Sequence, residues 1–184
     1  TDNHIRAISD VLDYNTDIEI FPFGVPHMKE KSTLDYYLSG LKRLRTRLEE
    51  LTGNEITDFK LKQAISLCNR ERELLRTISL RRKSDAVPIK GRDFLAVNHG
   101  SLLADKESML TLLESLCSEL SRRASHPTNG ARLLLTGSTL AIGDYRLVDI
   151  LEEAGAIVVI EEFAEGLKPY WVDVTLDGDP MEAL

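Results

Sequence analysis

The sequence has few of the residues that build metal sites or disulfide frameworks. Its 184 residues include two cysteines, four widely separated histidines and one tryptophan. Two cysteines cannot form the disulfide framework of a small secreted domain, and the histidine spacing does not fit a zinc site. Cys68 and Cys117 both fall in register with the apolar residues of expected helices. They are therefore interpreted as small core residues.

Long apolar runs and a surplus of positive charge are also missing. No segment approaches the ~20 apolar residues of a membrane span, and the first residues lack the apolar core of a signal peptide. The net charge of -7 argues against binding to a phosphate backbone. The arginine-rich stretch from Asn69 to Lys83 is expected to be the solvated face of a helix. These absences predict a soluble, cytoplasmic protein without a membrane or nucleic-acid partner.

One stretch of the sequence, residues 132–166, is typical of a strand, loop, helix and second strand. Leu133 to Leu135 form an apolar run, and residues 147–151 repeat with helical spacing until Gly155. Ala156 to Ile160 form a second apolar, β-branched run. Two such runs joined by a helix indicate parallel strands that are buried on both faces. The predicted fold class is α/β.

Ligands of parallel sheets bind where strands end and helices begin. This rule brings residues 136–144 and 161–166 to one rim of the sheet. Backbone N–H groups and hydroxyls beside a helix N-terminus favour an anion or a carbonyl oxygen. The candidate substrate-binding residues are Thr136, Gly137, Ser138, Thr139 and Glu162. The glycine spacing matches neither a dinucleotide fingerprint nor a P-loop, so a nucleotide is not expected.

Simpler roles compete with ligand binding at this rim. Gly137 can provide the turn after the strand, and Asp144 can be the N-cap of the next helix. Glu161 and Glu162 could serve as an acid–base pair if they were buried together. The more economical interpretation of these two glutamates is a solvated strand end.

Most of the remaining chain has helical spacing. Leu34 to Leu51 mark one helix that Gly53 closes, and Thr57 can cap the next. Further helices are expected after Gly91 and after Asp105.

The two ends of the chain look like parts of larger units. The first residues predict a helix followed by a strand from Asp17 to Phe21, and Asp179 with Pro180 predicts the start of a final helix. We therefore expect a piece of a longer protein that consists of three-layer parallel-sheet units with an inserted helical section. Residues 1–26 would end one α/β unit, 27–130 form the helical section, and 131–184 begin a Rossmann-like domain.

Three segments carry a family resemblance: LEELTGNEIT, NRER and LEEAGAIVV. With the order of elements, they resemble the D-component family of 2-hydroxyacyl-CoA dehydratases, which includes benzoyl-CoA reductase subunits. The resemblance implies paired homologous subunits that act on CoA thioesters, with a helical section between α/β domains. It also implies a [4Fe-4S] cluster between domains and an ATP-dependent activator protein that delivers an electron.

The chain departs from this family at the expected cluster ligands. Members with a cluster have cysteines at positions that match Thr1, Ser138 and Ala164. None of these side chains replaces an iron-bound thiolate. The resemblance thus implies a subunit that binds no cluster itself and supports a cluster-bearing partner, with the three positions still close together in space.

Two alternatives stay open. The whole protein could be an active hydro-lyase or reductase whose cluster ligands lie outside this region. The chain could also be a non-catalytic interaction or assembly module that docks through its helical section. The sequence identifies neither a catalytic residue nor the acyl-CoA substrate.

Overall fold

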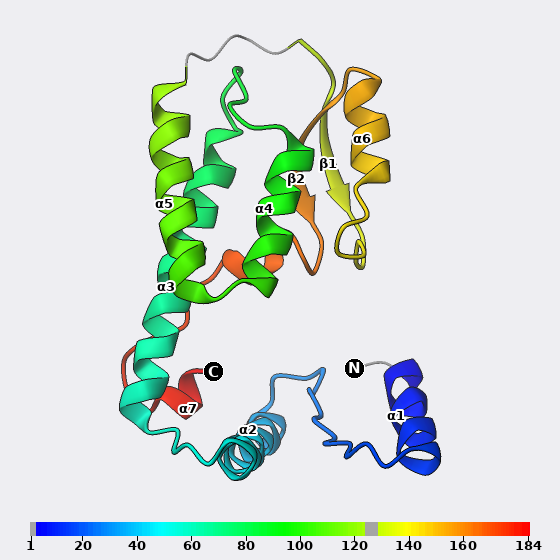
Figure 1. Cartoon of the computed structure of the whole chain (residues 1–184), viewed down its shortest axis with the longest axis vertical. Coiled ribbons are helices and arrows are strands. Elements are labelled where there is room, and N and C mark those ends of the chain that lie inside the picture. The colour runs from blue at the N-terminus through cyan, green and yellow to red at the C-terminus, as the bar shows by residue number, and fades with distance from the viewer. Residues whose placement is uncertain (1–2, 124–128) are drawn as a thin grey trace. The chain divides into compact units, whose positions relative to one another are not determined.

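The computed structural model describes residues 3–123 and 129–184 (Figure 1). The chain forms two compact units. The first unit consists of Thr1–Leu61 with Leu176–Leu184, and the second consists of Lys62–Thr175. These boundaries differ from the three predicted domains, which stay a prediction. None of the helices within the described ranges combines the length and apolar composition that crossing a bilayer requires.

The first unit is helical. It contains α1 (Asn3–Asn15), α2 (Lys31–Thr52), the first residues of α3 (Asp58–Arg81) and α7 (Pro180–Ala183). As predicted, α2 ends at Gly53, whose φ of 67° is left-handed and whose N–H donates to the Glu49 carbonyl. The Asp179 carboxylate caps α7 by accepting from the Met181 N–H, and α7 contacts α2.

The predicted strand from Asp17 to Phe21 is wrong. This segment follows α1 in an irregular conformation and pairs with no strand among the described residues. A strand needs a neighbour that satisfies its backbone N–H and C=O groups. Sequence alternation alone cannot supply that neighbour.

The second unit contains the main hydrophobic core. Three helices enclose this core: most of α3, α4 (Gly91–Leu103) and α5 (Lys106–Arg122). The predicted caps are confirmed, because the Thr57 hydroxyl accepts from the Lys60 N–H at 3.2 Å and the Asp105 carboxylate from the Ser108 N–H at 2.9 Å. The buried cluster consists of Leu74, Leu75, Ile78, Ile89, Phe94, Met109, Leu113, Leu120 and Tyr170.

The second unit also contains the predicted strand, helix and strand. These elements are β1 (Arg132–Thr136), α6 (Arg146–Glu153) and β2 (Ile157–Glu162), followed by the short 3₁₀ helix η1 (Lys168–Tyr170). β1 and β2 pair in parallel, which confirms the mixed α/β character, and α4 and α6 both contact β2 (Figure 1). The three-layer arrangement stays a prediction.

Burial differs between the two strands. Val158 of β2 is fully buried and packs with Leu95 of α4 and Val148 of α6, whereas Leu134 of β1 is 56% exposed. The expectation that both strands are buried on both faces is therefore wrong for β1 within the described residues. Gly91 is required at the close approach of α4 to β2, since a Cβ there would lie 2.6 Å from the Val158 Cβ.

Asp144 does not occupy the N-cap of α6. Tyr145 is the N-cap residue, and the Asp144 carboxylate accepts from the Arg146 backbone N–H at 3.3 Å. Hydrogen bonding with the Arg146 side chain lowers the pKa of Asp144 to about 2. Asp144 thus stabilises the first turn of α6 from the position before the N-cap, whereas the sequence predicted Asp144 as the N-cap itself.

Candidate functional site

The ends of the two parallel strands meet at the predicted rim. Thr136 pairs with Glu162 in the sheet register, and the Thr136 hydroxyl donates to the Glu162 carboxylate at 2.5 Å. The Lys168 ammonium lies 3.5 Å from the other carboxylate oxygen. The hydrogen bond from Thr136 and then the charge of Lys168 lower the pKa of Glu162. Glu162 is therefore suited to accept hydrogen bonds as a carboxylate rather than to act as an acid near neutral pH.

The loops that follow β1 and β2 lie against each other. The Ala164 N–H donates to the Ser138 carbonyl at 3.2 Å. A Cβ at Gly137 would lie 3.1 Å from the Phe163 ring. Two of the three positions that the resemblance assigns to cluster ligands are thus neighbours. Thr1, the third, lies outside the described residues.

The loop after β1 is open to solvent. Thr136, Gly137, Ser138 and Thr139 are all exposed. The pocket of the second unit includes Glu165 and Gly166 in its lining, but not these four residues. The substrate-binding role of the four residues and Glu162 therefore stays a prediction.

Glu161 is not a solvated strand end. Glu161 and Arg82 are 0% and 1% exposed, and the guanidinium binds both carboxylate oxygens at 2.5 and 2.7 Å. The Arg82 guanidinium also lies 4.0 Å from the centre of the Phe94 ring. Because Arg82 occupies this carboxylate, Glu161 and Glu162 do not form an acid–base pair. Sequence reasoning missed Arg82, which was expected on a solvated face.

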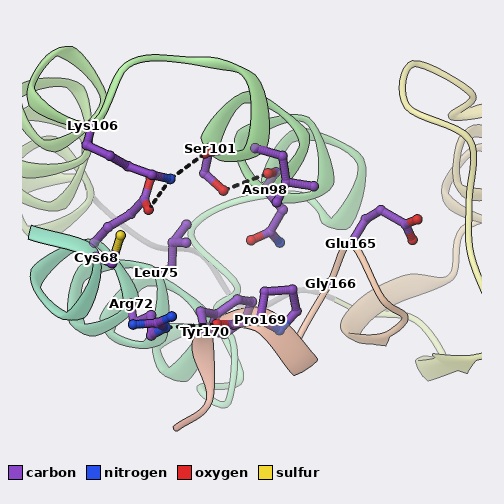
Figure 2. A pocket seen from close by; sticks show the side chains of 12 residues that line it. Cys68, Arg72, Leu75, Asn98, Ser101, Lys106, Glu165, Gly166, Pro169 and Tyr170 are labelled. Atoms are coloured by element: carbon purple, nitrogen blue, oxygen red, sulfur yellow. Dashed lines mark hydrogen bonds and ion pairs between the residues drawn. The ribbon is translucent and has the colours of Figure 1, made fainter. Parts of the chain in front are cut away.

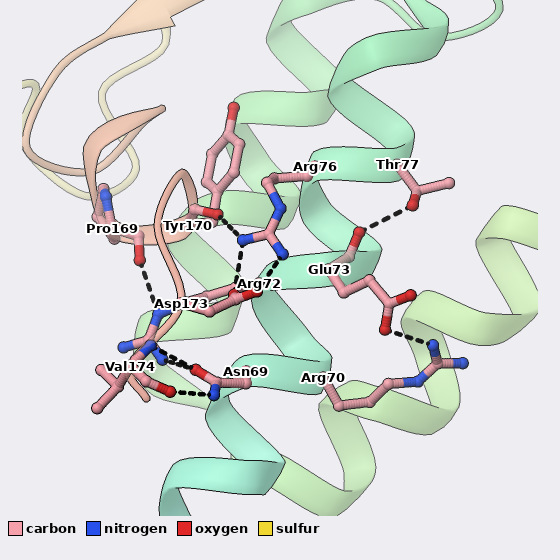
Figure 3. Close-up of polar contacts among 10 residues, drawn as sticks. All are labelled: Asn69, Arg70, Arg72, Glu73, Arg76, Thr77, Pro169, Tyr170, Asp173 and Val174. Atoms are coloured by element: carbon pink, nitrogen blue, oxygen red, sulfur yellow. Dashed lines mark hydrogen bonds and ion pairs between the residues drawn. The ribbon is translucent and has the colours of Figure 1, made fainter. Parts of the chain in front are cut away.

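The NRER segment holds the chain that follows η1. The Asn69 side chain donates to the Val174 carbonyl at 2.7 Å and accepts from the Val174 N–H at 3.0 Å. The Arg72 guanidinium donates to Asn69 and to the Pro169 carbonyl. Figure 3 shows these side chains reaching from α3 toward the segment.

Arg76 continues this contact one turn along α3. Its guanidinium binds both Asp173 carboxylate oxygens at 2.7 Å and the Tyr170 carbonyl at 2.8 Å (Figure 3). The prediction of a solvated arginine face is thus wrong for these positions, whereas the exposed Arg70 forms ion pairs with Glu73 and Glu114. The arginines of α3 have mainly structural contacts.

A pocket of about 150 Å³ opens between α3, α4 and the segment after β2 (Figure 2). Lys106 lies at its edge, where the ammonium is 2.6 Å from a Glu71 carboxylate oxygen and 2.9 Å from the Ser101 carbonyl. The lining residues are Cys68, Glu71, Arg72, Leu75, Asn98, Ser101, Leu102, Lys106, Glu165, Gly166, Pro169 and Tyr170.

Two polar atoms of this pocket are buried without a hydrogen-bond partner. They are Oε1 of Glu71 and Nδ2 of Asn98, in side chains of residues that are 6% and 2% exposed. Leaving such a group unsatisfied costs about 1–3 kcal/mol, so unpaired groups at a cavity indicate a binding site. The sequence contained a signal, because Glu71 falls in the apolar stripe of its helix between Cys68 and Leu75.

His99 is a further buried polar residue of α4. Its Nδ1 accepts from the Gly143 N–H at 3.3 Å, and its ring stacks on Tyr145 with 5.4 Å between the ring centres. Burial lowers the pKa of His99. The neutral ring thus joins α4 to the loop that precedes α6.

The described residues do not fit an iron–sulfur cluster. They contain no group of three or more histidine, cysteine, aspartate or glutamate residues that could hold a metal ion. Ser138 offers a hydroxyl and Ala164 a methyl group, whereas such clusters require thiolates. Cys68 and Cys117 lie half-buried on α3 and α5, and burial raises the pKa of the Cys117 thiol. The core interpretation holds for Cys117, which packs against the main cluster, whereas Cys68 lines the pocket.

Comparison with known proteins identifies the family. A benzoyl-CoA reductase subunit of Thauera aromatica is 26% identical over 151 residues, covering 82% of this chain and 39% of that protein. The (R)-phenyllactyl-CoA dehydratase beta subunit of Clostridium sporogenes is 26% identical over 168 residues, covering 91% and 44%. YjiM of Escherichia coli (strain K12), described as a possible dehydratase subunit, is 27% identical over 161 residues, covering 85% and 42%.

The chain spans about two fifths of the length of these curated relatives. A family model described as 2-hydroxyglutaryl-CoA dehydratase, D-component, matches residues 1–184. Since this match covers the whole chain, the chain belongs to the 2-hydroxyglutaryl-CoA dehydratase D-component family.

Proposed function

We propose that this chain is part of a cytoplasmic subunit that binds no cluster and supports the dehydration or reduction of a CoA thioester by a homologous, cluster-bearing partner. The observation that carries the proposal is the hydrogen bond between Ala164 and Ser138, at 3.2 Å. It supports the residue-by-residue match to the family at two ligand positions. These positions carry a hydroxyl and a methyl group, which cannot replace thiolates.

Membership of the family supports a partner subunit, because the relatives are themselves named as subunits. An ATP-dependent activator protein would then deliver the electron to the cluster of that partner. The acidic net charge of -7 favours a complex without nucleic acid.

The rim after β1 and β2 is the part of this chain that we assign to the substrate. Thr136, Ser138 and Thr139 are exposed and offer hydroxyl groups, beside the backbone N–H groups of the loop. The Glu162 carboxylate, with its lowered pKa, is an acceptor at the same edge. These groups suit an uncharged part of a thioester that both donates and accepts hydrogen bonds.

Reconstitution tests this role. The full-length protein is purified without oxygen, alone and with its co-purifying partner, and is assayed for CoA-thioester dehydration and reduction with an ATP-driven electron donor. We expect turnover only in the complex, and a loss of turnover in the complex with Thr136→Val and Ser138→Ala. Thr77→Ala, on the exposed side of α3, is the matched control. Turnover by the protein alone would contradict the proposal and support an active enzyme with ligands elsewhere.

A docking module is the second candidate function. Exposed apolar residues of α2, among them Leu34, Leu48 and Leu51, support it because exposed apolar surface favours association. The same reconstitution separates the two functions. A docking module would still bind the partner after the Thr136 and Ser138 substitutions and would leave its turnover unchanged.

A further inference from the structure

The pocket of the second unit is lined by residues from separate parts of the chain. Its walls come from α3, from α4 and from the segment between β2 and the end of η1 (Figure 2). The hydrogen bonds of Asn69 and Arg72 to Val174 and Pro169 fix this segment against α3. These contacts hold one wall of the pocket against α3.

Two buried polar atoms of the pocket have no hydrogen-bond partner: one is a donor and the other is an acceptor. Nδ2 of Asn98 is buried and has no acceptor, and Oε1 of Glu71 is buried and has no donor. Buried polar groups in folded proteins are nearly always paired with protein, water or ligand. A fitting occupant therefore accepts a hydrogen bond from Asn98 and donates one to Glu71.

Charge and size restrict the occupant further. Lys106 binds the second oxygen of Glu71, so the pair is electrically balanced without a charged ligand. Leu75, Leu102 and Pro169 add apolar wall. A volume of about 150 Å³ equals that of a cavity known to hold benzene, which indicates roughly six non-hydrogen atoms.

We propose that this pocket binds a small, uncharged carboxamide, either as a free molecule or as the end of a longer one. Its carbonyl oxygen accepts from Asn98 Nδ2, its N–H donates to Glu71 Oε1, and its alkyl part lies against Leu75 and Leu102. The pocket is separate from the rim residues Thr136 to Thr139. The inference does not depend on the proposed role in CoA-thioester chemistry.

Titration by NMR tests the pocket directly. Isobutyramide is added to the ¹⁵N-labelled chain, and the side-chain amide signals of Asn98 are followed together with the backbone amide signals of Ser101 and Leu102, which also line the pocket and remain in Asn98→Leu. We expect a saturable shift with isobutyramide and none with isobutyrate at equal concentration, because the anion cannot donate to Glu71. Asn98→Leu and Glu71→Gln should each weaken binding by roughly tenfold, as loss of one buried hydrogen bond does.

Two further variants keep the test decisive. Leu102→Trp blocks the pocket at an exposed position and should abolish binding without unfolding the chain, whereas Thr77→Ala should leave binding unchanged. A chain occupied by water alone would show no saturable shift, and that result would overturn the proposal. Equal binding of isobutyrate, or binding that survives Leu102→Trp, would do the same.

Discussion

The buried ion pair between Arg82 and Glu161 leads to a quantitative prediction. Both side chains are excluded from solvent, and two short hydrogen bonds join them. Removing one partner of such a pair leaves an uncompensated buried charge and costs about 3–5 kcal/mol. Replacing both partners with apolar side chains of similar volume is often neutral or stabilising. We therefore expect Arg82→Met and Glu161→Leu each to destabilise the second unit more than the double variant does.

Urea unfolding measures the effect. Trp171 is the sole tryptophan of the sequence and belongs to the same unit, so its fluorescence reports on this unit. A loss of 3–5 kcal/mol is a large part of the ~5–15 kcal/mol of a typical domain. With a slope of ~2 kcal/mol per M, each single variant should lower the urea midpoint by roughly 1.5–2.5 M.

The ion pair between Arg70 of α3 and Glu114 of α5 is the matched control, because it also joins two elements that are distant in sequence but is exposed to solvent. Its double-mutant cycle should show little coupling. Unchanged midpoints in Arg82→Met and Glu161→Leu would refute the reasoning. A double variant that lost the sum of the two single losses would refute it as well.

Three further predictions concern smaller contacts. Burial lowers the pKa of His99 below 6.5, so the unfolded chain binds the proton more readily than the folded chain does. The free energy of unfolding should therefore fall as the pH drops below 6.5. The urea midpoint of His99→Gln should depend less on pH. Asn69→Leu removes two hydrogen bonds to Val174 and should cost about 1–3 kcal/mol, measured by the same unfolding. Ser138→Cys with Ala164→Cys should form a disulfide on mild oxidation, since the two backbones are hydrogen-bonded; thiol titration that still counts both new cysteines would contradict the contact.

Much of the local structure could be predicted from the sequence because its causes are local. Gly53 ends α2 in a left-handed conformation, and Asp105 caps α5 with its own side chain. The parallel pairing of β1 and β2 was also predictable, since a helix of suitable length joins two apolar runs. In each case the interacting residues are neighbours in sequence or belong to one motif.

The burial of charged residues could not be predicted in this way. Arg82 and Glu161 are 79 residues apart, and Asn69 is 105 residues from Val174. Nothing in an arginine-rich helix reveals which guanidinium will meet a buried carboxylate. Local pattern therefore favoured a solvated face, and tertiary packing decided otherwise.

The two candidate sites differ in whether the local sequence can locate them. The rim of Thr136 and Glu162 follows from a rule about strand ends, so the sequence located it. The pocket of Glu71 and Asn98 depends on how α3 meets α4 and the segment after β2. Its single local signal was a glutamate within an apolar stripe.

The most direct test of a cluster-free role is the iron and acid-labile sulfide content of the full-length protein, purified without oxygen and separated from any partner. Ser138 and Ala164 cannot serve as thiolate ligands, so we predict no stoichiometric iron or sulfide in this protein, with the cluster in the partner fraction. A [4Fe-4S] cluster in the separated protein, at one per chain, would contradict the proposed role.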